Sequence, residues 1–191
     1  MKEWRILESA YPVSNRWLKV RRDTCQLPDG RVIDDFYVLV ENDVGSVFAL
    51  TPDRRVVLVE QYKHGIGQVC LELPAGCFEA HDSNPLAAAR REFMEETGYD
   101  AAEYRYLGRL AQSPTRMTNY FHTYLALDVF PTASGQQLDP TEDITVRLIP
   151  LDEVFAMIAS GAIHAVATVA GIYMGWAALN NPASGAGAPT G

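Results

Sequence analysis

The chain has 191 residues, of which 48% are hydrophobic and 21% charged, and its formal net charge is −8. This length and composition are typical of one globular domain with at most a small addition, and they allow a full core without disulfides. The negative charge argues against non-specific nucleic-acid binding, and the sequence shows neither a signal-peptide pattern nor a membrane-length apolar run. Since three cysteines without a CxxC pair are typical of a reduced protein, we expect a cytoplasmic location.

Segments rich in β-branched and aromatic residues predict strands at residues 17–22, 32–40, 46–50, 56–62, 104–110, 121–128 and 144–149. Pro28-Asp29-Gly30 separates the first two segments and predicts a hairpin, because Pro fixes φ and Gly accepts a positive φ. Residues 56–59 are apolar enough to be buried on both faces of a sheet. We therefore expect an antiparallel β-region over residues 1–48. The resemblance described below implies that this region forms the dimer.

One helix is predicted from Pro85 to about Thr97. Asn84 is a favourable N-cap, Pro85 suits the first helical position, and Gly98 suits the position where the chain leaves the helix. Leu86, Ala89 and Phe93 share one face of this helix and are expected to pack against a sheet.

A second helix begins near Leu151, since apolar residues recur there at helical spacing, and Gly161 can end it. A third, over residues 166–179, is apolar around much of its surface and is expected to be well buried. Residues 181–191 are rich in Gly, Ala, Pro and Ser, so we expect a flexible tail.

Many strands with few helices, and no regular alternation of the two, predict an α+β fold of the α/β/α-sandwich kind. The sequence contains neither GxGxxG nor a P-loop, which argues against a doubly wound nucleotide fold. We assign residues 49–180 to the main domain.

Three glutamates in the first predicted helix carry the chemistry. Glu92 and Glu96 stack four residues apart on one helical face, with Glu95 beside them. Like charges at this spacing repel, and the C-terminal half of a helix disfavours anions, so the pattern favours a bound cation such as Mg²⁺ or Mn²⁺. A solvated acidic face is the alternative. The extended segment 71–76, which ends in a glycine where the backbone can approach a ligand, favours the cation.

Residues 76–99 resemble the Nudix box, a Gly, five residues, a Glu, seven residues and then Arg-Glu-apolar-x-Glu-Glu-x-Gly-apolar. The second half of this pattern is matched fully, by Arg91, Glu92, Phe93, Glu95, Glu96, Gly98 and Tyr99. In the first half, Asp82 stands where the first Glu belongs, and eight residues rather than seven separate it from Arg91. The resemblance implies a hydrolase that uses divalent metal to cleave a diphosphate bond.

By this resemblance Glu92 and Glu96 are metal ligands, Glu95 is a further ligand or a base, and the Ala75 carbonyl completes the site. Arg91 orients the glutamates through charge-assisted hydrogen bonds. Glu142, in the late acidic loop, matches a metal-contacting glutamate. Some relatives have the general base two residues earlier, where this chain has Pro140. The base is therefore left open between Glu142, Glu95 and metal-activated water alone.

Outside the box the chain resembles ADP-ribose pyrophosphatases over most of its length. Pro114 falls about as far beyond the box as the proline that marks this subgroup, and Lys63 and Arg116 are candidate contacts for the diphosphate. ADP-ribose or a related nucleoside diphosphate sugar is the implied substrate, and a homodimer is the implied assembly. Hydrolysis of another nucleotide sugar such as GDP-mannose, and a non-catalytic nucleotide sensor, are the alternatives.

Overall fold

The computed structural model describes residues 2–181, which form two compact units. The N-terminal unit runs to Asp43 and includes Ala111–Tyr120, whereas the main unit includes Val44–Leu110 and continues from Phe121. Of the predicted tail, all but Asn181 lies outside the described residues. None of the helices within residues 2–181 is long and apolar enough to cross a membrane.

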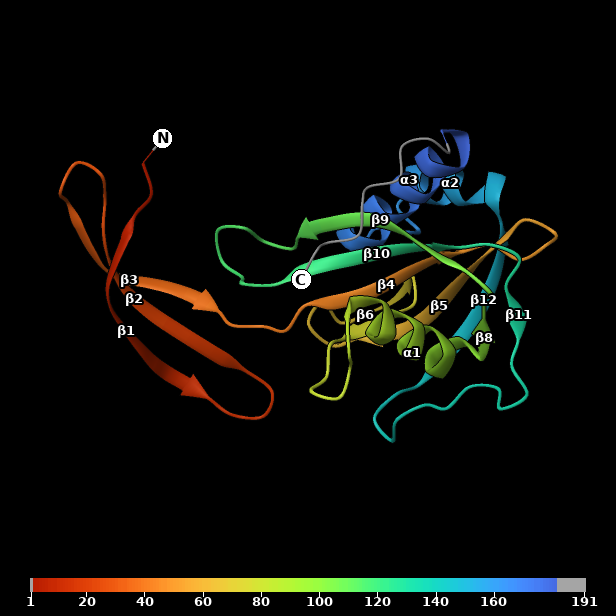
Figure 1. The fold of residues 1–191 in the computed structure, drawn as a ribbon, viewed down its shortest axis with the longest axis horizontal. Coiled ribbons are helices and arrows are strands. Elements are labelled where there is room, and N and C mark those ends of the chain that lie inside the picture. Colours follow the sequence, from red (N-terminus) through yellow and green to blue (C-terminus); the bar gives the residue numbers. More distant parts are fainter. Residues whose placement is uncertain (1, 182–191) are drawn as a thin grey trace. The chain divides into compact units, whose positions relative to one another are not determined.

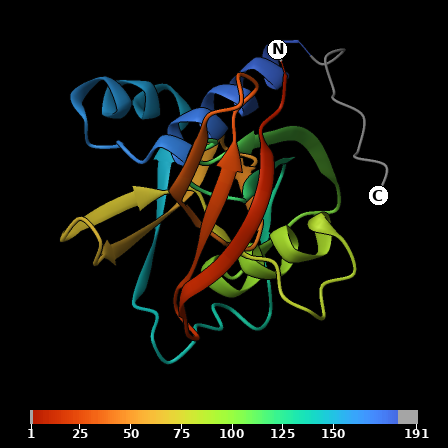
Figure 2. The ribbon, with the colours of Figure 1, turned by 90° about the vertical axis from the view of Figure 1, so that its left-hand side faces the viewer.

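The N-terminal unit is an antiparallel sheet of three strands, β1 (Arg5–Ser14), β2 (Lys19–Gln26) and β3 (Val32–Leu39), which Figure 2 shows side by side in red to orange. The predicted hairpin joins β2 to β3. Its Gly30 has φ 90° and donates its N–H to the Leu27 carbonyl at 3.0 Å, so the positive φ expected of this glycine is confirmed.

The main unit is built on two sheets and a short strand pair. Its strands are β4 (Val44–Ala49), β5 (Arg55–Lys63), β6 (Gln68–Glu72), β7 (Ala75–Cys77), β8 (Tyr99–Asp100), β9 (Tyr104–Ala111), β10 (Tyr120–Ala126), β11 (Phe130–Pro131) and β12 (Ile144–Pro150). The first sheet has the order β7-β4-β10-β9, with β4 and β10 parallel, and the second has the order β12-β5-β6, with both pairs antiparallel. The short strands β8 and β11 pair with each other.

Three helices cover these sheets: α1 (Pro85–Thr97), α2 (Leu151–Ser160) and α3 (Val166–Asn180). In the main unit of Figure 1, α1 lies below the strands and α2 and α3 lie above them. Successive side chains of a strand point to opposite faces, so β4 serves both layers. Its Val47 packs in the cluster around Phe93 of α1, whereas its Phe48 packs in the cluster around Ile172 of α3. The predicted α/β/α arrangement is therefore confirmed.

The prediction that the third helix is well buried is wrong. One face of α3 is buried, because Gly175 allows close approach: a Cβ atom there would lie 2.1 Å from Cδ1 of Phe48. The opposite face is open, with Val166 82% and Trp176 45% exposed. The helix is the outer layer of a sandwich rather than a core element, so its apolar outer residues are covered only by each other and by Phe155 of α2.

Candidate functional site

The bounds of α1 are fixed by its two ends. Asn84 accepts the Ala87 N–H through Oδ1 at 3.0 Å, and Pro85 occupies the first turn. At the other end Gly98 adopts a left-handed φ of 71° and donates its N–H to the Met94 carbonyl at 2.8 Å. The predicted start and end of this helix are confirmed, and with them the positions of its glutamates.

One face of α1 is pressed onto β4. Ala89 and Phe93 are fully buried, and a Cβ atom at Gly45 would lie 2.7 Å from the Ala89 backbone, so only glycine fits at that point of the strand. This close docking determines which edge of the helix faces β7, the strand paired with β4. Glu92 and Glu96 lie on that edge.

Glu92 lies directly against the backbone of β7. A Cβ atom at Gly76 would lie 2.0 Å from Cδ of Glu92, so any other residue there would displace the carboxylate from this place. Burial raises the pKa of Glu92, an effect that the charge and hydrogen bonding of Arg91 oppose and the carboxylates of Glu95 and Glu142 reinforce. Gly76 is thus required so that a carboxylate can approach this part of the main chain.

Glu96 is the most deeply buried carboxylate of the helix, with 6% of its surface exposed. Its Oε2 accepts the Ala75 N–H at 2.9 Å, which ties the helix to β7. Burial raises the pKa of Glu96 to about 8, against the lowering effect of the Ala75 hydrogen bond and of Lys63. The negative charge of Glu96 is thus met by one neutral N–H group and, within residues 2–181, by no adjacent cationic side chain.

Arg91 is the centre of a hydrogen-bond network. Its Nη1 donates to Glu92 Oε1 at 2.8 Å and to Glu95 Oε2 at 3.1 Å, while its Nη2 donates to the Cys77 carbonyl at 3.2 Å. On its other side it binds Asp82 through Nε at 3.2 Å and Nη2 at 3.0 Å. Arg91 therefore orients two of the three glutamates.

The Asp82–Arg91 pair explains the departure of the loop from the sequence pattern. The hydrogen bond from Arg91 lowers the pKa of Asp82, against the opposing effect of its burial, so the carboxylate is held charged. An aspartate side chain is shorter than that of a glutamate, and with one extra residue between it and Arg91 the Asp82 carboxylate reaches the Arg91 guanidinium.

A cavity of about 190 Å³ opens beside Glu96 and β7. The residues that line it are Val44, Val59, Lys63, Glu72, Leu73, Ala75, Gly76, Cys77, Glu96, Phe121, Ala167 and Thr168. Lys63 Nζ lies 2.9 Å from Glu72 Oε2 and donates to Gln61 Oε1 at 2.8 Å, so its ammonium is held at the wall. Sequence reasoning did not single out Glu72 or Thr168, since neither belongs to a spaced pattern.

Glu142, Pro114 and Arg116 are not among the residues that line this cavity. Glu142 is half-buried in the loop before β12, and its carboxylate accepts the Asp139 N–H at 2.9 Å. Its charge reaches the site, because it raises the pKa of both Glu92 and Glu96 as a lesser cause after burial. Pro114 and Arg116 belong to the N-terminal unit.

Within that unit Arg116 is packed on β3. Its Nη1 donates to the Tyr37 carbonyl at 3.2 Å, and its guanidinium carbon lies 5.1 Å from the centre of the Phe36 ring. Pro114 lies in a turn in which the Ser113 carbonyl accepts the Arg116 N–H at 2.9 Å. The exposed guanidinium is therefore held in place by its own unit.

The donor set near Glu96 suits a hard divalent cation. Among residues 2–181, no three His, Cys, Asp or Glu side chains are already gathered as a metal site. The set here instead combines two carboxylates, Glu92 and Glu96, with the main chain at Ala75, and oxygen ligands of this kind are those that Mg²⁺ and Mn²⁺ prefer. A cation would also supply the positive charge that the raised pKa of Glu96 shows to be lacking.

Comparisons with known proteins match most of the chain. A family model for the NUDIX domain matches residues 41–169, and a model for the nucleoside diphosphate sugar hydrolase N-terminal domain matches residues 4–39. The chain is 29% identical over 167 residues to the methanol dehydrogenase activator of Bacillus methanolicus, covering 87% of this chain and 89% of that protein. It is 26% identical over 139 residues to the ADP-ribose pyrophosphatase of Bacillus subtilis, covering 73% and 74%.

A GDP-mannose pyrophosphatase of Klebsiella pneumoniae is 30% identical over 164 residues, covering 80% of this chain and 81% of that one. The crystal structure of an ADP compounds hydrolase superposes with a TM-score of 0.80 over 96% of this chain and 97% of that chain. Its sequence identity is 18%, so this likeness concerns the fold alone.

Proposed function

The chain belongs to the NUDIX domain family, and from this premise we propose that it hydrolyses the diphosphate bond of ADP-ribose or a closely related nucleoside diphosphate sugar with Mg²⁺. With ADP-ribose the products are AMP and ribose 5-phosphate. Mn²⁺ is an alternative cation, since it accepts the same oxygen ligands. The relatives named for ADP-ribose and GDP-mannose pyrophosphatase activity support this substrate class.

The observation that carries the proposal is the approach of Glu92 and Glu96 to the backbone of Ala75 and Gly76. Glycine is required at position 76 by the Glu92 carboxylate, and Glu96 binds the Ala75 N–H although burial disfavours its charge. Stability alone does not require a buried carboxylate here, because an apolar side chain would pack there without the cost of an unpaired charge. They gather oxygen ligands at the wall of a cavity.

We assign roles to the side chains as follows. Glu92, Glu96 and the Ala75 carbonyl hold the cation, with Glu95 and Glu142 as further ligands, and Arg91 keeps Glu92 and Glu95 in place. A bound divalent cation supplies charge neutralisation at the diphosphate and lowers the pKa of a coordinated water.

Lys63 faces the cavity that holds Glu96 and is assigned to the diphosphate, with Glu72 and Gln61 fixing its ammonium. Arg116 and Pro114 are assigned to substrate binding by the family resemblance. The general base stays open between three candidates: Glu142 or Glu95 would accept the proton of the attacking water, or metal-activated water alone would suffice.

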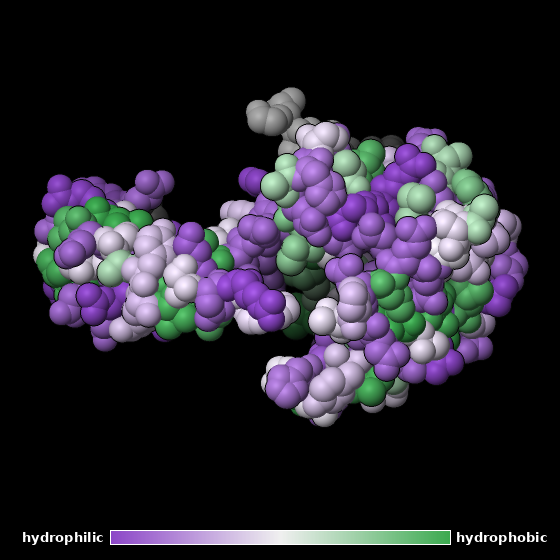
Figure 3. Space-filling model, turned by 90° about the horizontal axis from the view of Figure 1, so that it is seen from below, coloured by the Kyte–Doolittle hydropathy of each residue, from purple (hydrophilic) through white to green (hydrophobic). Residues whose placement is uncertain are grey.

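We also propose a homodimer formed through the N-terminal unit. This unit exposes large apolar side chains, including Ile6 and Tyr11 on β1 at 53% and 50% and Trp17 in the following turn at 72%. Figure 3 shows hydrophobic surface among its hydrophilic residues at the left. A single sheet that leaves such residues uncovered is typical of an interaction surface. Sedimentation at micromolar concentration tests this proposal, which a monomer would contradict. The compartment is proposed to be the cytoplasm, since three cysteines without a CxxC pair are typical of a reduced protein.

The decisive experiment is a substrate panel with matched variants. The purified protein is incubated with Mg²⁺ and ADP-ribose, GDP-mannose, UDP-glucose, NADH or a diadenosine polyphosphate, and the released products are measured. Glu92→Gln is expected to lower kcat/KM at least about a hundredfold, because it weakens a direct ligand. Glu153→Gln, an exposed glutamate on α2, is the control and is expected to change nothing.

Each outcome separates the alternatives. Preference for GDP-mannose would keep the reaction and replace the substrate. Nucleotide binding without turnover of any compound would favour the non-catalytic sensor and contradict the proposal.

A further inference from the structure

The loop that joins β11 to β12 runs along the last turn of α1. Thr132 donates to the Gly98 carbonyl through its N–H at 2.7 Å and through Oγ1 at 3.0 Å. Further along, the Gln137 N–H donates to the Glu95 carbonyl at 2.9 Å. Carbonyls at the end of a helix have no partner within the helix, so this loop supplies the donors that α1 lacks.

Gln136 makes a different kind of contact, since it joins three elements through one side chain. Its Nε2 donates to the Glu96 carbonyl at 2.7 Å and to the Ile144 carbonyl at 3.2 Å. An amide nitrogen carries two hydrogens, and both are used here. The side chain therefore connects the loop and the end of the glutamate-bearing helix to the first residue of β12.

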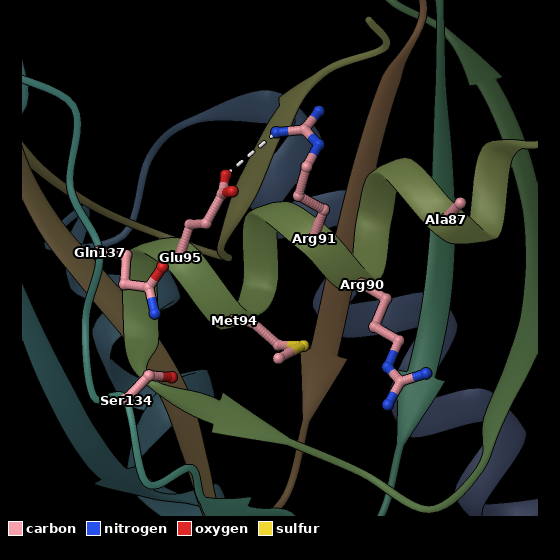
Figure 4. A pocket seen from close by; sticks show the side chains of 7 residues that line it. All are labelled: Ala87, Arg90, Arg91, Met94, Glu95, Ser134 and Gln137. Carbon is pink, nitrogen blue, oxygen red and sulfur yellow. Dashed lines mark hydrogen bonds and ion pairs between the residues drawn. The ribbon is translucent and has the colours of Figure 1, made fainter. Parts of the chain in front are cut away.

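Away from the last turn, the loop passes over the outer face of α1. A cavity of about 470 Å³ lies there, lined by Ala87, Arg90, Arg91, Met94 and Glu95 of the helix and by Ser134 and Gln137 of the loop (Figure 4). Because this space separates loop from helix, contact is concentrated at the last turn. There the fit is close, since a Cβ atom at Gly98 would lie 2.8 Å from the carbonyl carbon of Gly135.

The same loop carries Glu142 two residues before Ile144. Glu142 and Asp139 close a small turn, in which the Asp139 N–H donates to Glu142 Oε2 and the Glu142 N–H donates to the Asp139 carbonyl, both at 2.9 Å. The turn holds the carboxylate relative to its own backbone. It does not by itself hold that backbone relative to α1, and the Gln136 bridge supplies this second constraint.

We infer that Gln136 is a positioning residue for the reaction: its amide holds the Glu142 turn at a fixed place relative to the last turn of α1 by bridging the Glu96 and Ile144 carbonyls. The inference rests on the proposed function, because Glu142 has a role only if the diphosphate is hydrolysed. No atom of Gln136 needs to touch the substrate.

The test compares two neighbouring variants. Gln136→Leu keeps the bulk of the side chain but removes both hydrogen bonds. Gln137→Ala is the matched control, because the contact of Gln137 with Glu95 is made by its backbone and survives the change. We expect Gln136→Leu to lower kcat about tenfold with KM changed less than twofold, and Gln137→Ala to leave both within twofold of the unmodified protein.

A double-mutant cycle shows whether Gln136 acts through Glu142. In a Glu142→Gln background, Gln136→Leu is expected to reduce kcat by less than twofold further, because the group that it positions is already lost. Gln136→Glu, which keeps the length but replaces the donor with an acceptor, is expected to behave as Gln136→Leu does.

Amide hydrogen exchange gives a readout that is independent of turnover. Peptides covering residues 132–143 are expected to exchange faster in Gln136→Leu, and at the unmodified rate in Gln137→Ala, while peptides from β4 and β5 are unchanged in both.

The outcomes separate this inference from the proposed function. If Glu142→Gln impairs hydrolysis and Gln136→Leu does not, the inference fails and the proposed function stands. An equal tenfold loss in the Glu142→Gln background also overturns it, because Gln136 would then act through α1 instead. If the unmodified protein hydrolyses no compound of the panel, the proposed function fails and the inference fails with it.

Discussion

Each unit buries carboxylates almost completely. Asp23 in the N-terminal sheet has 2% of its surface exposed, and in the main unit Glu96 has 6% and Asp100, which is paired with Arg90, has 7%. The instructive contrast is between Asp23 and Glu96. Their environments differ sharply. Asp23 accepts hydrogen bonds from Arg21 Nε at 2.9 and 3.0 Å and from Ser9 Oγ at 2.6 Å. Glu96 accepts one from the Ala75 N–H, and no ion pair to it lies within 4.0 Å among the described residues.

The consequence is that their pKa values move in opposite directions. Burial acts to raise the pKa of Asp23, but the hydrogen bonds from Arg21 and Ser9 outweigh it and the pKa is lowered. For Glu96 burial dominates, and the pKa rises to about 8. Asp23 is thus paired within the chain, whereas Glu96 has no charged partner of its own in the part of the chain that the structure describes and, under the proposed function, would gain one in the bound cation.

The largest expected difference concerns activity. Glu96→Gln is expected to lower kcat/KM for ADP-ribose about a thousandfold, or about 4 kcal/mol of transition-state stabilisation, because an amide is a poor ligand for a hard cation. Asp23→Asn is expected to leave kcat per folded molecule within about twofold. Steady-state kinetics on both variants measures this, with circular dichroism to confirm folding. Equal losses of activity in Glu96→Gln and Asp23→Asn would contradict the distinction between the two carboxylates.

Stability should show the reverse order. Asp23→Ala is expected to lower the free energy of unfolding by about 3 kcal/mol, because it leaves Arg21 without its partner in a mostly buried place. Asp34→Ala, an exposed aspartate on β3, is the control and should change it by less than about 0.5 kcal/mol. Urea titration of both measures this, and equal midpoints would show that the Asp23 pair adds nothing to the fold.

The site was predictable where its parts are local in sequence. The caps of α1 and the spacing of Glu92 and Glu96 follow from one short segment, and the structure has the helix where these residues predict it. The α/β/α layering was also predictable, since strands such as β5 are apolar on both faces. The sequence showed that Asp82 stands near the first acidic position of the pattern. Its ion pair with Arg91 was not predicted, because the extra loop residue breaks the expected spacing.

Contacts between distant segments were not predictable. The Gln136 bridge joins loop, helix and strand without any sequence pattern. Strand β6 was missed although it follows β5 directly, because it mixes polar and apolar residues and is defined by its pairing with β5. The open face of α3 was missed for a related reason. Composition shows that a helix is apolar, but its neighbours decide which face is covered, and here Gly171 and Gly175 mark the covered one.

A divalent cation should distinguish the two carboxylates without any turnover. At a Mg²⁺ concentration about a hundredfold above its dissociation constant, the unmodified protein is expected to gain about 2.7 kcal/mol of stability, because the cation binds only the folded site. Asp23→Asn should gain as much, and Glu96→Gln much less. Thermal unfolding in Mg²⁺ and in EDTA measures the gain, and an undiminished gain in Glu96→Gln would place the cation elsewhere.

The pH dependence of stability in EDTA is expected to separate the two carboxylates in its slope, to which one proton contributes at most about 1.4 kcal/mol per pH unit. The pKa of Glu96 is raised, so the folded state binds more protons than the unfolded state, and stability falls as pH rises from about 4.5 to about 8. The pKa of Asp23 is lowered, so its contribution is complete above its ordinary value and is lost as pH falls through the folded value. Glu96→Gln should therefore flatten the curve on the neutral side, and Asp23→Asn should flatten it on the acid side. Urea midpoints across pH 3 to 8.5 test both signs together, and a curve that Glu96→Gln leaves unchanged would mean that its charge is compensated in solution after all.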